Sequence, residues 1–196
     1  MDSDKLGDRF VPAKRVIVVI DLTNFARAFQ ERSDAQLAAF LDSYYALCEE
    51  KLAAPGVGGR IVKFMGDACL AVFPAELAGA AVSAVVHLQH DLDALTREQA
   101  LPFAMGANIH MAELVEAELG GGSSRRADVI GRGVNQAFLL GRGAGVRISE
   151  PVYRSLASGE RSPWTKHKPP AVYSLANPGE VYGGLGKDAA TNAQRW

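Results

Sequence analysis

Apolar and polar residues follow one another along this chain in patterns that predict strands and helices in turn. The run VIVVID, residues 16–21, is apolar, β-branched and ends on an acid, which is typical of a buried strand with an exposed last residue. In the segment 33–54, apolar residues recur at helical spacing, and Ser33 or Asp34 supplies an N-cap. We therefore expect a buried strand, a turn away from it, and a long amphipathic helix.

Short strands and further helices are expected over the rest of the chain. The runs RIVKFM and CLAVF, residues 60–65 and 69–73, predict a hairpin because the intervening GDA offers a glycine for a tight turn. A second long helix is expected over residues 75–96. The remaining pattern predicts strands at 103–111 and 113–120 paired through a turn, a strand at 128–131, a helix at 134–142, a strand at 145–149, a short helix after Pro151 and a closing strand at 171–175.

This order of elements predicts an α+β fold. Hairpins that lie beside helices are accommodated most simply by a mixed, mainly antiparallel sheet with helices packed on one face. A chain of 196 residues is long enough for one such domain. We expect an N-terminal extension at 1–13, the folded domain at 14–176 and a C-terminal tail at 177–196.

Composition narrows the class of protein. The chain is 48% hydrophobic and 22% charged, as ordinary globular proteins are. No apolar run approaches the roughly 20 residues that cross a bilayer, and the first residues lack the apolar core of a secretory signal. A net charge of −1 argues against a nucleic-acid-binding protein. We expect a cytoplasmic protein without a membrane or nucleic acid as partner.

Two carboxylates fall where neighbouring strands would end. Asp21 closes the first strand and Asp67 lies in the hairpin turn, so the two lie side by side if those strands are adjacent. Paired carboxylates commonly hold Mg²⁺ or Mn²⁺ in nucleotide chemistry, with other positions left to water and phosphates. The alternative is that both acids serve only turns and caps. A helix starting just after Asp21 would also offer a triphosphate free backbone N–H groups, those of Leu22, Thr23, Asn24 and Phe25.

Three stretches of the chain carry a resemblance to a known family. VVIDLTNFARAF, VKFMGDACLAVF and DVIGRGVNQA resemble, in order and spacing, the three motifs of class III nucleotidyl cyclases, over roughly residues 14–175. The resemblance implies a ferredoxin-like cyclase fold for residues 14–176. It also implies an enzyme that makes a 3',5'-cyclic nucleotide and pyrophosphate from a nucleoside triphosphate. Asp21 and Asp67 match the family's metal-binding aspartates, which implies two Mg²⁺ or Mn²⁺ ions per active site.

The resemblance extends to the residues that recognise the nucleotide. Lys63 matches the residue that reads a ring nitrogen of adenine, and Asp128 matches its partner at the adenine amino group. Guanylyl cyclases typically carry Glu and Cys or a similar residue there, so this pair implies ATP as substrate. A donor and an acceptor fixed at opposite edges discriminate because the wrong base leaves a buried polar group unpaired. Asn135 matches the asparagine that orients the ribose.

The chain departs from the family at one position. Leu139 stands where the family usually has an arginine that stabilises charge developing on the α-phosphate. Arg142, another helical turn along the same face, is the nearest replacement, and Arg132, before the helix, is a second. Losing such a charge costs on the order of 10² to 10³ in rate. Lys166 or Lys168 lies near where the family often has a phosphate-binding lysine.

The resemblance also implies a homodimer with active sites at the interface. In the family, the base-reading set and the metal set of one site come from opposite subunits, so Lys63 and Asp67 would serve different active sites. An adenylyl cyclase is the leading hypothesis. One alternative is a cyclase for another base, either a pyrimidine cyclase making cUMP or cCMP in antiphage signalling or a guanylyl cyclase. The other is a catalytically degenerate, nucleotide-binding regulatory protein, which Leu139 favours and the intact aspartates oppose.

Overall fold

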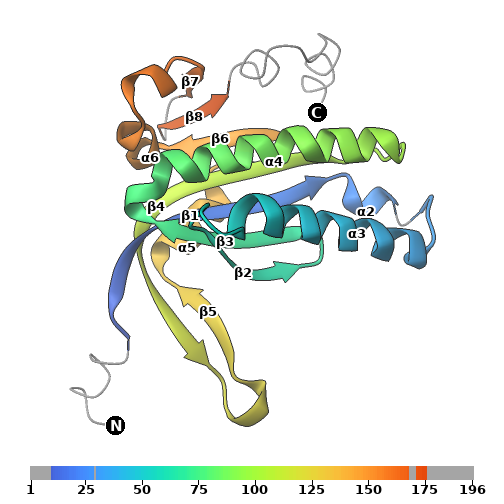
Figure 1. Cartoon of the computed structure of the whole chain (residues 1–196), viewed down its shortest axis with the longest axis horizontal. Helices are drawn as coiled ribbons and strands as arrows, with labels where there is room; N and C mark the ends of the chain where they lie inside the picture. Colours follow the sequence, from blue (N-terminus) through green and yellow to red (C-terminus); the bar gives the residue numbers. More distant parts are fainter. Residues whose placement is uncertain (1–9, 29, 168–170, 176–196) are drawn as a thin grey trace.

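The computed structural model describes residues 10–28, 30–167 and 171–175, and its strands form one sheet (Figure 1). The spatial order is β2-β3-β1-β4-β6-β8-β7, and β5 pairs with the C-terminal part of β4. All pairings are antiparallel except that of β4 with β6, which is parallel. The strands are β1 Pro12–Thr23, β2 Arg60–Met65, β3 Ala68–Pro74, β4 Ala104–Leu119, β5 Arg126–Ile130, β6 Gly145–Ser149, β7 Trp164–His167 and β8 Val172–Leu175.

Two long helices, α3 and α4, cover one face of the sheet (Figure 1). Helix α3 begins as its sequence predicts, because the Ser33 hydroxyl caps it by accepting from the Gln36 N–H. A π-helical turn, η1, continues α3 toward the hairpin. The helices are α2 Phe25–Ala28, α3 Asp34–Cys48, η1 Glu49–Ala53, η2 Ala75–Leu77, α4 Ala78–Glu98, η3 Gly122–Ser124, α5 Arg132–Leu139, α6 Glu150–Ser155 and η4 Ser158–Glu160.

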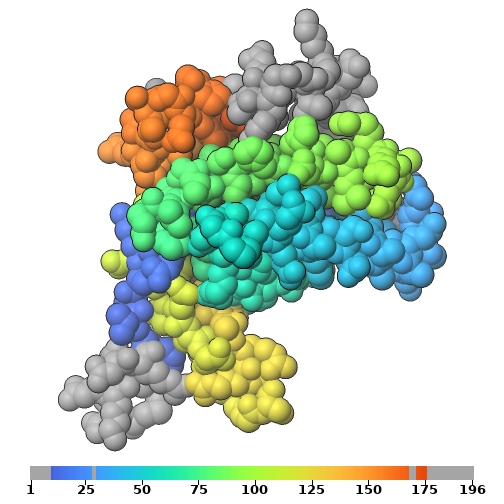
Figure 2. All heavy atoms as spheres, viewed as in Figure 1, coloured from blue at the N-terminus to red at the C-terminus, as the bar shows by residue number. Residues whose placement is uncertain are grey.

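The main core lies between the sheet and these two helices. Val16, Val18 and Ile20 of β1 point into it, and its largest fully buried side chains include Tyr44 and Phe40 of α3. The predicted fold class, an α+β domain with a mainly antiparallel sheet, is confirmed. Figure 2 shows α3 and α4 packed side by side, with the β4–β5 hairpin projecting beyond them. No helix in the described part of the chain has the length and apolar character that would let it cross a membrane.

The opposite face of the sheet carries the short helix α5 and a smaller core. Ile17 and Val19 of β1 pack there with Val134 and Ala137 of α5. We call this side of the sheet the α5 face. Several of the residues described below lie on this face.

The structure corrects one sequence prediction about strands and adds one strand that was not expected. Residues 103–111 and 113–120 are not two paired strands but the single strand β4, Ala104–Leu119. The junction between the two expected strands is Ala112, which is not a turn-forming residue, and β1 is long enough to pair with β4 from Thr23↔Ala104 to Pro12↔Val115. The edge strand β7 was not predicted from the sequence.

Candidate active site

Asp21 and Asp67 meet where strands β1 and β3 stop pairing. The last pair of their ladder is Ile20↔Cys69, so Asp21 follows it on one strand and Asp67 precedes β3 in the turn from β2. Asp21 continues the alternation of Ile17 and Val19, which places its side chain on the α5 face. Partial burial raises the pKa of Asp21, and the adjacent Asp67 carboxylate raises it further. The sequence-based expectation that these two acids lie side by side agrees with this geometry.

The acid pair suits a hard divalent cation. Neither Asp21 nor Asp67 forms an ion pair with a lysine or arginine in the described part of the chain. Carboxylate oxygens are the ligands that Mg²⁺ and Mn²⁺ prefer, and such ions usually keep several positions for water and substrate phosphates. No third histidine, cysteine or acid joins them as a cluster among the described residues.

The segment after Asp21 differs from the expected phosphate cradle. Strand β1 runs on to Thr23, whose hydroxyl donates to the Ala104 carbonyl at 3.1 Å, and Leu22 is buried in the core. Asn24 forms the turn at φ 64°, and α2, a single turn, begins only at Phe25. The prediction of a helix beginning directly after Asp21 is therefore wrong. Pairing with β4 commits Leu22 and Thr23 to the sheet, so they are not the free N-terminus of a helix.

A β-bulge brings Lys63 to the same face as Asp21. Strands β2 and β3 pair at Ile61↔Ala71, and then the register shifts so that Lys63 lies opposite Leu70. Without that shift Lys63 would lie opposite Cys69, which belongs to the main core under α3 and α4. Leu70 belongs to the smaller core, so the bulge turns Lys63 onto the α5 face.

Lys63 and Asp128 form an ion pair that joins β2 to β5. The Lys63 ammonium donates to both Asp128 carboxylate oxygens, at 2.9 and 2.7 Å, and the Val129 N–H donates to the same carboxylate at 2.8 Å. Burial alone would raise the pKa of Asp128, but these hydrogen bonds outweigh it and hold that pKa below its usual value. The two residues that the resemblance assigns to the base, 65 positions apart in sequence, are thus in direct contact.

Nearby side chains fix the two strands that carry these pairs. The Tyr45 hydroxyl of α3 donates to the Gly66 carbonyl at 2.6 Å, one residue before Asp67, and its ring stacks on Phe64 at 3.8 Å. At the other end of the hairpin, Glu116 of β4 accepts from Arg15 at 2.6 Å and also binds Arg60 of β2. The sequence offered no signal for these supporting contacts, since they join residues distant along the chain.

Of the residues expected to contact ribose and phosphate, Asn135 lies on α5 but Arg142 does not. Asn135 is exposed on α5, and Leu139 is 78% exposed at the last residue of the helix. Arg142 does not lie another turn along the same face, because α5 ends at Leu139 and Gly143, with φ 81°, continues as a loop. Arg132 is not before the helix but is its first residue. The side chain of Arg142 is exposed and has no partner among the described residues.

The lysine expected to bind phosphate lies at the far edge of the sheet. Lys166 is on β7, at the opposite end of the strand order from β2. Its ammonium is 3.5 Å from a Glu150 carboxylate oxygen of α6 and 5.5 Å from the centre of the Tyr173 ring. The structure does not bring Lys166 to the acid pair or to Lys63 within one chain. Lys168 lies outside the described residues.

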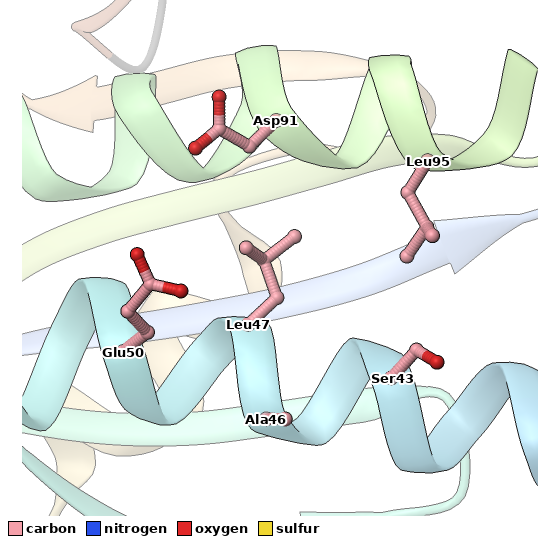
Figure 3. Close-up of a pocket in the computed structure, with 6 residues that line it drawn as sticks. All are labelled: Ser43, Ala46, Leu47, Glu50, Asp91 and Leu95. Atoms are coloured by element: carbon pink, nitrogen blue, oxygen red, sulfur yellow. The ribbon is translucent and has the colours of Figure 1, made fainter. Parts of the chain in front are cut away.

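A separate hollow lies between α3 and α4 and does not include any of these residues (Figure 3). Glu50 and Asp91 at its rim are both bound by Lys51, at 2.9 and 2.7 Å, so its charges are already paired. It belongs to the helix-covered side of the molecule. The residues that line it are Ser43, Ala46, Leu47, Glu50, Asp91 and Leu95.

The known structures that this protein resembles are adenylyl and guanylyl cyclases. The structure superposes on the adenylyl cyclase CyaB from P. aeruginosa with a TM-score of 0.75 and 19% identity, over 86% of this chain and 96% of that one. A guanylyl cyclase gives a TM-score of 0.72 at 21% identity, over 89% of this chain and 98% of that one. The chain has the fold of a nucleotidyl cyclase catalytic domain. The resemblance seen in the three motifs is confirmed.

The sequence comparison agrees with this cyclase fold. A curated adenylate cyclase of Anabaena cylindrica is 27% identical over an alignment of 160 residues that covers 75% of this chain. The matched region is 32% of that relative, so the chain spans about a third of its length. No family model matches the chain. The guanylate cyclase domain from Catenaria anguillulae, solved in complex with GTP, has the same fold, with a TM-score of 0.67 at 16% identity over 83% of this chain and 95% of that one.

Proposed function

We propose that this protein is a nucleotidyl cyclase that converts ATP to 3',5'-cyclic AMP and pyrophosphate. The observation that carries the proposal is how the fold sorts four distant residues into two pairs of opposite character. Asp21 and Asp67 form a pair of like charges, and no lysine or arginine of the described residues forms an ion pair with either. Lys63 and Asp128 form a donor–acceptor pair. A metal–triphosphate group and an adenine edge need these two arrangements respectively.

The reaction makes one phosphorus–oxygen bond and breaks another. The ribose 3'-oxygen attacks the α-phosphorus, the bond from that phosphorus to the bridging oxygen breaks, and pyrophosphate leaves with the electron pair while the hydroxyl proton is released. Asp21 and Asp67 would hold two Mg²⁺ or Mn²⁺ ions. When bound, these ions polarise the 3'-hydroxyl and neutralise the leaving group. Asn135, exposed on α5, would orient the ribose so that its 3'-oxygen lies in line.

Base selection is assigned to Lys63 and Asp128. Both are partly buried, and each satisfies the other in the absence of a nucleotide. An adenine edge would take over part of these hydrogen bonds, since a ring nitrogen accepts from an ammonium and an amino group donates to a carboxylate. A base with the opposite pattern could take over neither hydrogen bond, so its own edge would stay unpaired in a desolvated site, at a cost of roughly 1–3 kcal/mol for each unpaired group.

A homodimer is part of the proposal, with each site formed from the metal set of one subunit and the base set of the other. Exposed apolar side chains next to the site residues support such an interface. Met65 lies between Lys63 and Asp67, and Phe138 and Leu139 follow Asn135 on α5. Their exposed fractions are 39%, 41% and 78%. Such side chains gain from burial against a second copy of the chain.

The central experiment tests substrate and product together. The purified protein is incubated with Mn²⁺ and, in turn, ATP, GTP, CTP and UTP, and the products are identified by chromatography and mass spectrometry. Cyclic AMP as the dominant product is expected. Asp21→Ala and Asp67→Ala should each abolish turnover, and Arg97→Ala, an exposed arginine at the end of α4, is the control that should not change it. Near-normal turnover in either aspartate variant would show that the metal assignment is wrong.

A mixing experiment tests the shared site. Asp21→Ala and Lys63→Ala are each expected to be nearly inactive alone. In a mixed dimer one of the two sites keeps both intact sets, so an equal mixture should recover roughly a quarter of the wild-type rate after subunit exchange. A mixture as inactive as its parts, in subunits shown to exchange, would mean that each site comes from one chain.

Two observations favour an alternative base. Leu139 replaces the usual arginine, and guanylyl cyclases stand beside adenylyl cyclases among the structural relatives. A cyclase for another base would give cyclic UMP, CMP or GMP as the main product in the same experiment. If no triphosphate yields product while nucleotide still binds, the protein is instead a nucleotide-binding regulator.

A further inference from the structure

The segment 141–145, which leads from α5 to β6 and ends on the first residue of β6, is glycine-rich yet tightly held. We call it the α5–β6 loop. Arg147 of β6 makes four hydrogen bonds to its backbone carbonyls. One terminal nitrogen of the guanidinium donates to the carbonyls of Gly143 and Gly145, at 3.1 and 3.3 Å. The other donates to the carbonyls of Arg142 and Ala144, at 2.6 and 3.0 Å. One guanidinium therefore fixes four consecutive residues.

Close packing adds to this clamp. The amide of Asn108, a residue only 7% exposed on β4, donates to the Gly141 carbonyl at 3.0 Å. A Cβ on Gly141 would come within 2.4 Å of the Arg147 side chain. The carbonyl oxygen of Asn108 is buried and has no partner within the described residues. The loop is thus pressed against β4 and β6 and has little room to move.

The clamped loop lies directly beside Asp21 of the same chain. Asp21 pairs with Gly106 of β4, and cross-strand partners share a face of the sheet. A Cβ on Gly106 would come within 2.5 Å of the Gly143 carbonyl, so the loop fills the place that a side chain next to Asp21 would otherwise take. Residue 142, adjacent to Gly143, is an arginine with an exposed side chain.

The loop carries positive charge and free donors. Arg147 is half-buried and has no carboxylate within ion-pair distance among the residues that the structure describes. Arg142 is likewise unpaired in that part of the chain. The loop carbonyls are turned to Arg147, and the backbone N–H groups of Arg142, Gly143 and Ala144 donate no hydrogen bond to any described residue. Successive free N–H groups next to a guanidinium are a typical anion-binding arrangement.

We propose that the α5–β6 loop binds the terminal phosphates of the nucleoside triphosphate whose metal ions are held by Asp21 of the same subunit. Arg142 and the loop N–H groups contact the phosphates, and Arg147 is a positioning residue that sets the loop. This rests on the proposed function. It also assigns Arg142 a role different from that expected from the sequence. Arg142 serves the metal side of its own subunit and does not stand in for the arginine missing at Leu139.

The test measures phosphate binding without turnover. Inorganic tripolyphosphate is titrated into the full chain by calorimetry, once in EDTA and once with Mn²⁺. Arg142→Ala should weaken binding about tenfold in both conditions, because a charge-assisted contact to phosphate is lost. Arg97→Ala, on the opposite side of the sheet, should bind as the wild type does. Equal affinity of wild type and Arg142→Ala, or no binding by the wild type, would overturn the proposal.

A second set of variants separates positioning from simple stability. Arg147→Lys keeps the charge but cannot reach four carbonyls. It should weaken tripolyphosphate binding nearly as much as Arg142→Ala, and the double variant should be little worse than Arg142→Ala alone. If Arg147→Lys does not fold, Gly141→Ala takes its place in the test, because it displaces the guanidinium without removing it. Gly141→Ala should then weaken tripolyphosphate binding nearly as much as Arg142→Ala does. Full additivity in the double variant would show that Arg147 does not work through Arg142.

The outcomes also separate this inference from the proposed function. In turnover, the loop variants should raise KM for ATP more than they lower kcat. A protein that binds tripolyphosphate through Arg142 but cyclises no triphosphate would refute the function and leave the loop assignment standing. An active cyclase in which Arg142→Ala binds tripolyphosphate as the wild type does would refute the loop assignment and leave the function standing.

Discussion

The hairpin of β2 and β3 contributes one residue to each of two contrasting sites. At its turn, Asp67 meets Asp21, and partial burial together with the adjacent like charge raises the pKa of Asp21. Four residues earlier, Lys63 meets Asp128, and the opposite charges satisfy each other at 2.7 Å. The first pair is strained without a ligand and the second is complete without one. Under the proposed function, the unneutralised pair takes its counter-charge from a bound cation, whereas a base has to compete for the hydrogen bonds of the neutral pair.

The largest expected effect comes from removing the repulsion itself. Asp21→Asn should lower turnover with Mn²⁺ by roughly 10³-fold, because a metal ligand is lost. In EDTA the same variant should be slightly more stable than the wild type, by about one or two degrees in Tm, because two like charges no longer face each other. Differential scanning calorimetry in EDTA and a turnover assay measure the two effects. A variant less stable than the wild type in EDTA would remove the basis of the contrast.

Exchanging the charges of the second pair tests whether contact alone is enough. Lys63→Asp and Asp128→Lys should each destabilise the protein, since like charges then meet across β2 and β5. Combined, they restore an ion pair and should recover most of the stability. Turnover of ATP should nevertheless stay down roughly 10²-fold in kcat/KM, because donor and acceptor are reversed relative to adenine. Recovery of ATP turnover in the double variant would mean that the pair is structural only.

Leu139→Arg adds a positive charge at the end of α5, at a residue that belongs to neither pair. The side chain is 78% exposed, so the change should not disturb packing. If the family's arginine role is vacant, kcat should rise roughly tenfold, part of the value of one transition-state charge contact. Leu139→Gln, of similar length without charge, is the control and should have no such gain. An unchanged kcat in Leu139→Arg would indicate that another group already fills the role.

Tyr45→Phe tests how firmly the acid pair is held. The variant loses the hydrogen bond to the Gly66 carbonyl, 2.6 Å long, and keeps the stacking on Phe64. Mn²⁺ affinity, measured by electron paramagnetic resonance, should fall about fivefold because the Asp67 turn is less well ordered. Tyr153→Phe, which keeps a comparable stack on Tyr173 at 3.8 Å, should leave it unchanged. Equal loss in both variants would point to general loosening.

The smallest effect is in the pH dependence of the second pair. The pKa of Asp128 is lowered in the folded protein, so its contribution to stability is complete above the unfolded value of 3.8 and is lost as pH falls through the folded pKa. The stability gap between wild type and Asp128→Asn, measured by urea unfolding, should therefore close below that pH. In a Lys63→Gln background the closure should be much reduced. A gap that widens on acidification would contradict the assigned direction.

The local pattern of apolar and polar residues was sufficient to predict much of the fold, and the motifs were sufficient to propose the site residues. The β-branched run of β1 and the helical spacing of α3 and α4 were read correctly, since each buries one face of a regular element. The motifs placed Asp21, Asp67, Lys63 and Asp128 on the right elements. The division of residues 103–120 into two strands was wrong because a sixteen-residue strand needs a long partner, and β1 provides it only in the folded sheet.

The sequence by itself therefore determined which side chains are candidates for binding metal and base. Asp21 and Asp67 are candidates because of their places at strand ends, and Lys63 and Asp128 because of the resemblance to nucleotidyl cyclases. Tertiary structure decided where they point. The bulge at Ile61–Lys63 turns Lys63 onto the α5 face, and the pairing of β1 with β4 removes Leu22 and Thr23 from the expected cradle. Arg147 holds the loop that carries Arg142 beside Asp21. These outcomes depend on register and on carbonyls brought from distant positions, which no local pattern encodes.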